Sequence, residues 1–235
     1  MEYKFTAIIV EPRKHKALEF VLQNVCDCLS QDWKIILFHG KNNLDYSINI
    51  CEKLNKIYDN RIQLVNLYID NLNQDSYSKL FASKNKIYDY INSELFLVFQ
   101  TDSMIIKKNA HLIYDYLDYD YVGSPWKITS YIPTKNCNFI GNGGFSLRRK
   151  SKMMEIIEKI PYNNNYEDLY FSTNYEPSIN VYKPEYLKAC NFCVDEVFSE
   201  FTFAFHRCWV HEHYNKIKEL YPEIEILEKL QEEEE

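Results

Sequence analysis

The stretch LFLVFQTDS, residues 95–103, joins a run of apolar residues directly to a polar end. LFLVFQ (95–100) predicts a strand buried on both faces, which is typical of parallel sheets. Such sheets bind ligands at the carboxyl ends of their strands. Asp102 follows this strand at once, so its carboxylate is expected at a ligand-binding edge, where it could hold a hard divalent cation. The alternative is that Asp102 caps a helix beginning near residue 107 or closes a turn.

The same strand signal occurs three times upstream, and helical patterns separate the four strands. The predicted strands are 6–10, 33–40 and 62–69, and the predicted helices are 15–29, 44–58 and 75–92. This alternation predicts an α/β fold with a mostly parallel sheet flanked by helices. The carboxyl ends of parallel strands share one edge. We therefore expect one edge to gather Glu11, Arg13, His39, Gly40, Gln100 and Asp102.

After residue 103 the alternation becomes irregular. Strands are expected at 119–126, 139–148 and 201–206, and helices at 150–160, 165–175 and most of 184–198. The sequence contains no internal repeat, linker or break in composition. It therefore predicts one domain over residues 1–225, followed by an acidic tail over 226–235.

Composition narrows the function classes. The 235-residue chain is 46% hydrophobic with a formal net charge of -7, which excludes a disordered tail, a fibre and a disulfide miniprotein. An acidic chain without a basic stripe is poorly suited to binding nucleic acid. No run approaches the roughly 20 apolar residues that span a bilayer. The N-terminus lacks the layout of a signal peptide, and the cysteines are expected as free thiols, so a cytoplasmic location is expected.

Glycine is scarce, and its positions are therefore informative. Four of the five glycines fall between residues 123 and 144. The two familiar glycine-rich phosphate-binding patterns, G-x-G-x-x-G and the P-loop, are missing from the sequence. In Asn142-Gly143-Gly144 the glycines allow the backbone to approach another group closely, and a bulge at a sheet edge is the alternative.

Three further segments carry chemistry-bearing side chains. Glu167 and Asp168 open a predicted helix, where acidic residues are ordinary, but either could also serve as a general base. His206 ends the apolar strand FTFAFH and could be a metal ligand or a core residue. The run RRK (148–150) stands at a helix start, which disfavours cations, so it could bind a phosphate or form a solvated patch.

A zinc-like spacing is also present. Cys190-x2-Cys193, followed after 12 residues by His206-x4-His211, matches a Cys₂His₂ site. The intervening residues are acidic and aromatic, unlike the basic recognition helix of a DNA-binding finger. Both cysteines also fall on a predicted helix rather than a hairpin. A zinc-stabilised interaction protein is therefore the weaker alternative.

Several motifs follow one another between residues 5 and 210. They are IIVEPRKHKALEFVLQNV, WKIILFHG, SKLFASKNKIYDYI, LVFQTDSMI, YDYVGSPW, GNGGFSLRRKSKM, EDLYF and FAFHRCW. In this order they resemble the DUF5672 family of glycosyltransferase-like proteins. That family is similar in layout to GT-A fold glycosyltransferases, which use nucleotide-sugar donors and often Mn²⁺ or Mg²⁺. The resemblance implies a single-domain, GT-A-like (Rossmann-like) fold with an irregular C-terminal part.

The resemblance also implies where a donor would bind. Asp102 stands where GT-A enzymes have the last, metal-binding Asp of a D-x-D motif, and Gln100 replaces the first Asp. Glu11 and Arg13 match the strand end that touches the nucleotide base, with His39 and Gly40 on the same edge. Lys84 matches a helix position that reaches the diphosphate or ribose. The Asn142-Gly143-Gly144 turn resembles the loop beside the donor sugar and the acceptor.

The remaining matches concern the reaction. Glu167-Asp168 resembles the acidic pair from which an inverting enzyme draws its base, and His206 matches a late metal ligand. The implied function is transfer of a sugar from a UDP- or GDP-sugar to a glycan or other hydroxyl acceptor, with Mn²⁺ or Mg²⁺. A non-catalytic module that binds a nucleotide or carbohydrate on the same fold is the second alternative.

Overall fold

The computed structural model describes residues 3–84, 86–128 and 136–232. Its main sheet has six strands in the order β3-β2-β1-β4-β7-β6, and a small sheet has the order β5-β9-β8. The strands are β1 (Phe5–Glu11), β2 (Trp33–His39), β3 (Ile62–Asn66), β4 (Leu95–Val98), β5 (Ser103–Ile105), β6 (Tyr121–Pro125), β7 (Ile140–Arg149), β8 (Cys193–Val194) and β9 (Ala204–His206). The α/β fold with a mostly parallel sheet is confirmed.

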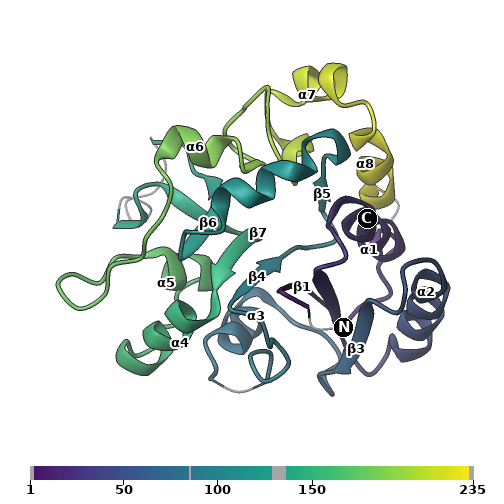
Figure 1. Cartoon of the computed structure of the whole chain (residues 1–235), viewed down its shortest axis with the longest axis horizontal. Helices are drawn as coiled ribbons and strands as arrows, with labels where there is room; N and C mark the ends of the chain where they lie inside the picture. The colour runs from purple at the N-terminus through teal and green to yellow at the C-terminus, as the bar shows by residue number, and fades with distance from the viewer. Residues whose placement is uncertain (1–2, 85, 129–135, 233–235) are drawn as a thin grey trace.

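Helices cover both faces of the main sheet (Figure 1). They are α1 (Leu18–Cys28), α2 (Leu44–Ile57), α3 (Gln74–Phe81), α4 (Lys150–Lys159), α5 (Glu167–Ser172), α6 (Tyr186–Cys190), α7 (Tyr214–Leu220) and α8 (Ile224–Glu232), with 3₁₀ helices η1 (Lys107–Tyr116) and η3 (Cys208–Val210). Figure 1 shows α1 and α2 at the right of the sheet and α3, α4 and α5 at the lower left.

The parallel half follows directly from the apolar runs. β1 pairs in parallel with β2 and β4, and β2 pairs in parallel with β3. Successive side chains of a strand point to opposite faces. Ala7 and Ile9 accordingly join one core cluster together with α1 and α2, whereas Ile8 and Val10 join a second cluster together with α3 and α4. This two-sided burial explains why these strands are apolar throughout.

The second half brings distant segments to the end of β4. β7 runs antiparallel to β4 and also pairs with β6, so the glycines at its start lie near the polar turn after β4. In the small sheet, β5 pairs antiparallel with β9, and Ser103 lies opposite His206. Asp102 and His206 are thereby placed next to each other although they are far apart in the sequence.

Three predicted helices are shorter than expected. The helix predicted over 75–92 begins at Gln74, with Asn73 as its N-cap, and ends at Phe81. Lys86 takes a φ of 77°, which an α-helix cannot continue. The helix predicted over 165–175 is limited to Glu167–Ser172. The helix over 184–198 ends at Cys190, because Cys193 and Val194 pair with β9 instead.

The C-terminal segment packs against the domain. The expected boundary at residue 226 falls inside α8, where Leu227 is buried in the core. Gln231 donates a hydrogen bond to the carbonyl of Thr101, 2.8 Å away, in the turn that carries Asp102. Residues 233–235 of the predicted tail lie outside the described residues. Helix α8 therefore supports the turn at the end of β4.

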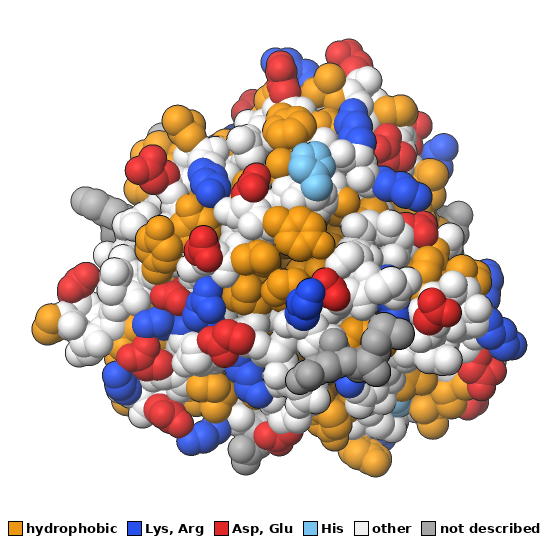
Figure 2. All heavy atoms as spheres, viewed as in Figure 1, with side chains coloured by type: hydrophobic (Ala, Val, Ile, Leu, Met, Phe, Trp, Pro, Cys, Tyr) orange, Lys and Arg blue, Asp and Glu red, His pale blue; other side chains and the backbone are white. Residues whose placement is uncertain are grey.

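The mixed charges of the surface and the free cysteines agree with what the composition predicts. Lys and Arg side chains are intermingled with Asp and Glu on the face shown in Figure 2. All seven cysteines are free, and six of them are buried. Within the described part of the chain, no helix has the length and apolar character to cross a membrane.

Candidate active site

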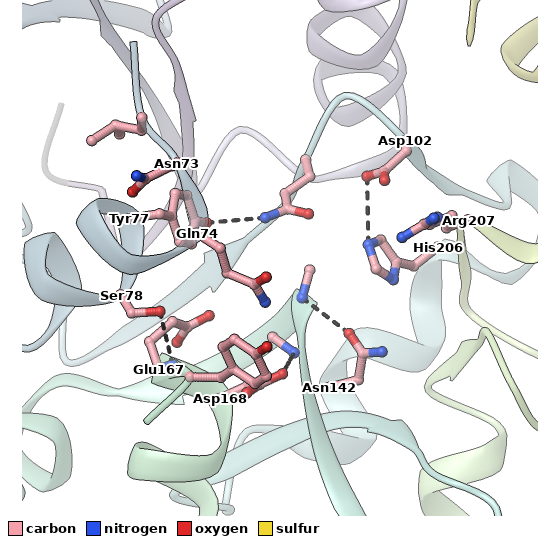
Figure 3. Close-up of a pocket in the computed structure, with 15 residues that line it drawn as sticks. Asn73, Gln74, Tyr77, Ser78, Asp102, Asn142, Glu167, Asp168, His206 and Arg207 are labelled. Carbon is pink, nitrogen blue, oxygen red and sulfur yellow. Dashed lines mark hydrogen bonds and ion pairs between the residues drawn. The ribbon is translucent and has the colours of Figure 1, made fainter. Parts of the chain in front are cut away.

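A cleft of about 430 Å³ lies beyond the carboxyl end of β4. Its walls come from α3, the turn after β4, the start of β7, the start of α5 and the end of β9. Figure 3 shows Asp102, His206 and Arg207 on one side of the cleft and Glu167 and Asp168 on the opposite side. We call these sides the histidine wall and the α5 wall.

On the histidine wall, Asp102 faces His206. Asp102 Oδ1 and His206 Nε2 lie 3.4 Å apart, and both atoms are buried without a hydrogen-bond partner. Burial opposes charge on Asp102, but the cationic His206 outweighs this effect and holds the pKa of Asp102 below its usual value. A bound cation that replaces the Nε2 proton would satisfy both of these buried atoms. The donor set, one carboxylate oxygen and one imidazole nitrogen, therefore fits a divalent metal.

A second acid supports this wall from behind His206. Asp195 is buried, and its Oδ2 accepts a hydrogen bond from His206 Nδ1 over 2.9 Å. Burial alone would lower the pKa of His206, but Asp102 and Asp195 on either side raise it to about 10. The imidazole thus carries a positive charge between two carboxylates, which is the electrostatic position that a metal cation would take.

The α5 wall is built around a buried ion pair. Arg148 has no exposed side-chain surface, and its guanidinium contacts Glu167 with Nη1–Oε2 at 2.6 Å and Nη2–Oε1 at 3.1 Å. The guanidinium also lies over the rings of Phe81 and Tyr121, each 5.1 Å away. Both oxygens of Glu167 are engaged in this contact, so Glu167 is held as a structural partner of Arg148.

Asp168 lies next to this pair and has a different environment. Its Oδ1 accepts a 2.7 Å hydrogen bond from its neighbour Leu169 N, and its Oδ2 is 3.4 Å from Gly143 N. Burial and the negative charge of Glu167 raise the pKa of Asp168 to about 7. A half-buried carboxylate with this pKa, lining a cleft, is suited to taking a proton near neutral pH.

Gly143 and Gly144 let β7 pass between the two walls. A Cβ on Gly143 would overlap Glu167 Oε1, and a Cβ on Gly144 would overlap the imidazole of His206. Asn142 lines the same cleft, and its Oδ1 accepts a hydrogen bond from Gly144 N over 3.2 Å. The expectation of close backbone approach at this turn agrees with the structure.

A smaller hollow of about 230 Å³ adjoins the cleft. The two share Leu72, Tyr77, Gln100 and Asp102. Glu11 is buried in the hollow and accepts hydrogen bonds from Arg13 through Nε at 2.9 Å and Nη2 at 2.8 Å. Gln100 donates to the hydroxyl of Tyr77 over 3.2 Å. The structure thus brings Glu11, Arg13, Gln100 and Asp102 together, as the sequence predicts.

Three predicted donor-site residues lie elsewhere. His39 is buried with Nδ1 2.7 Å from the carbonyl of Gly40, and neither residue lines the cleft or the hollow. A Cβ on Gly40 would stand 2.8 Å from Pro12 Cβ, so this glycine serves packing. Lys84 lies beyond the end of α3, exposed, and pairs with Glu158 at 2.6 Å. The predicted helical position of Lys84 is therefore wrong, and Lys84 lines neither cavity.

The basic run 148–150 is not a phosphate site or a solvated patch. Arg148 is buried against Glu167, as described above. Arg149 pairs with Asp120 at 3.2 Å, and Lys150 donates to the carbonyl of Ile91 over 2.6 Å. These cations sit at the end of β7 and the start of α4, where backbone carbonyls and acids satisfy them.

The zinc-like spacing has a different explanation. His206 and His211 both contact the carboxylate of Asp195, and the thiol of Cys193 lies 3.8 Å from the carbonyl of Val194. Over the described residues, no group of three or more His, Cys, Asp and Glu side chains is arranged to hold a metal ion. The two histidines therefore share an acid, and the Cys₂His₂ arrangement is not formed.

Sequence reasoning missed several residues of the cleft. Arg207 takes a φ of 46°, and its side chain lines the cleft beside Asp102. Its position directly after His206 was the available signal. Gln74 reaches into the cleft from α3 (Figure 3). Asp195 lies outside the cleft and contacts His206 through its Nδ1 atom. Asp195 gave no local signal, because its contacts depend on how distant loops fold.

Comparison with known families identifies the chain. A family model described as "Protein of unknown function (DUF5672)" matches residues 61–207, which is more than half of the chain. The chain belongs to the DUF5672 family. The resemblance inferred from the ordered motifs is thereby confirmed. No curated protein matches this DUF5672 chain.

Solved structures with the same fold are GT-A glycosyltransferases. The glycosyltransferase GlyE of Streptococcus pneumoniae TIGR4 aligns with a TM-score of 0.54 at 11% sequence identity. The alignment covers 88% of this chain and 54% of GlyE. S. aureus TarS 1–349 aligns with a TM-score of 0.51 at 12% identity, covering 95% of this chain and 65% of TarS 1–349. The mannosyltransferase PcManGT of Pyrobaculum calidifontis, in complex with GDP-Man and Mn²⁺, aligns with a TM-score of 0.50 at 7% identity. The alignment covers 73% of this chain and 51% of PcManGT.

These similarities establish the fold of the DUF5672 chain as GT-A. At identities of 7 to 12% they establish the fold alone. The chain spans about half to two thirds of the length of the structures it matches. The arguments for activity therefore rest on the chain's own cleft.

Proposed function

We propose that this protein is a glycosyltransferase that moves a sugar from a nucleotide-diphosphate donor to a hydroxyl acceptor. The observation that carries the proposal is the pairing of two unlike walls across one cleft: a buried carboxylate–imidazole pair, Asp102 and His206, opposite an acid with a pKa near 7, Asp168. Metal-assisted departure of a diphosphate and proton removal from an acceptor need these two features on opposite sides of a sugar.

Donor binding is proposed along the two adjoining cavities. The nucleoside would occupy the hollow beside Glu11 and Arg13, and the diphosphate would lie near Asp102. Asp102 Oδ1 and His206 Nε2 would hold Mn²⁺ or Mg²⁺. When bound there, a divalent cation stabilises the negative charge that develops on the leaving diphosphate. Arg207, which lines the cleft beside Asp102, would add a second positive charge.

The acceptor would enter on the α5 side. Asp168 would accept the proton of the acceptor hydroxyl as the bond to the sugar forms, which suits an inverting reaction. Glu167 would keep Asp168 poised, because its charge raises the pKa of Asp168 while its own oxygens stay bound to Arg148. Gln74, whose side chain reaches into the cleft, is placed to hydrogen-bond the acceptor or the transferred sugar (Figure 3).

The test is a screen of UDP- and GDP-sugars with and without Mn²⁺. A donor present at 100 times its dissociation constant should stabilise the fold by about 2.7 kcal/mol, which a thermal shift detects. Release of nucleoside diphosphate on adding an acceptor supports the enzyme. Binding of UDP or GDP without metal and without turnover supports instead the non-catalytic module, which the replacement of the first D-x-D acid by Gln100 favours.

A further inference from the structure

Asp195 lies behind the histidine wall and joins three side chains. Its Oδ2 accepts from His206 Nδ1 at 2.9 Å and from Asn142 Nδ2 at 2.5 Å, and its Oδ1 lies 2.8 Å from His211 Nε2. The backbone carbonyl of Asp195 also contacts His213 Nε2 at 2.9 Å. Asp195 itself does not line the cleft, and it contacts His206 and Asn142, which do.

The contact with His206 decides which ring nitrogen faces the cleft. Because Nδ1 donates its proton to Asp195, Nε2 is the nitrogen whose proton a metal would displace, and it is the one that faces Asp102. A carboxylate behind a metal-binding histidine fixes the tautomer and the ring orientation and makes the imidazole a stronger ligand. A histidine without such a partner could turn either nitrogen, or neither, toward the cleft.

The contact with Asn142 extends the same control to the glycine turn. The Asn142 amide donates to Asp195, and this leaves its Oδ1 to accept from Gly144 N. Gly144 in turn packs against the ring of His206. One buried carboxylate therefore orients the histidine and the backbone segment that touches it.

We propose that Asp195 is the positioning residue of the cation site: it holds His206 with Nε2 directed at Asp102 and fixes the Asn142–Gly144 turn against the ring. This inference rests on the proposed function in one respect, namely that Asp102 and His206 bind a divalent cation. It also assigns a role to the zinc-like sequence pattern, since His206 and His211 meet at this acid.

The experiment compares wild type, Asp195→Asn and His211→Ala. The dissociation constant of Mn²⁺ is measured from the electron paramagnetic resonance signal of free Mn²⁺, with and without UDP or GDP. Asp195→Asn keeps the size of the side chain and removes its charge, so Mn²⁺ should bind about 10- to 100-fold more weakly, as expected for loss of an outer-shell carboxylate. His211→Ala removes another partner of Asp195 and leaves the His206 contact, so binding should change by less than about threefold.

The outcomes separate the two hypotheses. Unchanged Mn²⁺ affinity in Asp195→Asn, with binding by wild type, overturns the positioning role and leaves the proposed function standing. Equal loss in His211→Ala also overturns it, because the effect would then not pass through His206. Wild type that binds no Mn²⁺, with or without nucleotide, overturns the cation site itself and the positioning role with it.

A second measurement does not depend on the variant folding. In ¹⁵N-labelled wild type without metal, the Nδ1–H of His206 should give an imidazole resonance that exchanges slowly with solvent, because the proton is buried in the bond to Asp195. His211→Ala should retain that resonance. Rapid exchange or absence of the Nδ1–H signal in folded wild type overturns the proposal.

Discussion

On the histidine wall of the cleft, Asp102 and Asp195 flank a single cation, His206, whereas on the α5 wall Glu167 binds Arg148 and leaves Asp168 beside it. All four acids are at least partly buried, but the pKa of Asp168 moves in the opposite direction to the pKa values of Asp102 and Asp195. Those of Asp102 and Asp195 are lowered by the imidazolium, and that of Asp168 is raised by burial and by Glu167. The counter-ion within reach therefore decides whether a carboxylate in or behind this cleft stays ionised or keeps its proton.

The largest expected effect concerns the ion pair under the α5 wall. Arg148→Met leaves the buried charge of Glu167 uncompensated and should lower the free energy of unfolding by about 3–5 kcal/mol. Urea denaturation measures this change. Combining it with Glu167→Leu should recover most of the loss, because an apolar pair can replace a buried ion pair.

A surface ion pair gives the matched control. Lys84→Met removes the exposed partner of Glu158 and should change stability by no more than about 1 kcal/mol. If Arg148→Met is as mild as Lys84→Met, the α5 wall is not held by its buried pair, and the comparison between the walls fails.

The second effect concerns the proposed base. Asp168→Asn cannot accept a proton and should lower turnover of the donor by about 10²-fold or more, while donor binding in a thermal shift is retained. Asp75 is also an acid in the first turn of a helix, but it lies outside the cleft, so Asp75→Asn should keep full turnover. Equal rates in wild type and Asp168→Asn would exclude Asp168 as the base.

The third effect is on pH dependence. Turnover should rise with pH up to about 7, where Asp168 loses its proton, and fall about tenfold per unit below it. The contribution of Asp168 to the free energy of unfolding should instead fall as pH rises. Between pH 3.8, the ordinary pKa of an aspartate, and about pH 7, the folded state holds the Asp168 proton that the unfolded chain has lost. Wild type should therefore lose stability relative to Asp168→Asn as pH rises through this window. Unfolding of both proteins at several pH values checks the sign.

The smallest expected effects come from substituting two adjacent glycines, each of which packs against a different wall. Gly144→Ala crowds His206 and should weaken Mn²⁺ binding about fivefold or more, whereas Gly143→Ala crowds Glu167 and should leave Mn²⁺ affinity nearly unchanged. The Gly143→Ala change should appear instead in the pH profile of turnover. Equal effects of both substitutions on Mn²⁺ binding would mean that the walls are not independent.

The scaffold was predictable because its signals are local. Each of the four upstream apolar runs overlaps an observed parallel strand, since burial on both faces requires a continuous run of apolar residues. The same logic placed Glu11, Gln100 and Asp102 at one edge. It failed for His39 and Gly40, which line neither cavity. The helical position of Lys84, taken from the family resemblance, failed because α3 ends at Phe81.

The chemistry of the cleft was only partly predictable. Residue types made Asn142, Gly143, Gly144, Asp168 and His206 candidates beside structural alternatives, and the family resemblance assigned them to the site. All five line the cleft. The roles of Arg148 and Asp195 depend on strand pairing between distant segments, β4 with β7 and β8 with β9. A basic run looks solvated in the sequence, and only the fold shows that Arg148 is buried opposite Glu167.

The most direct test of the account is the Mn²⁺ dependence of nucleoside diphosphate release from a UDP- or GDP-sugar, measured for wild type and Asp102→Asn. Wild type should turn the donor over with Mn²⁺ and lose most of this activity in EDTA, because the cation stabilises the leaving diphosphate. Asp102→Asn should show low activity with or without Mn²⁺. Equal turnover by both proteins, with the same response to Mn²⁺, would contradict the assignment of the histidine wall as the cation site.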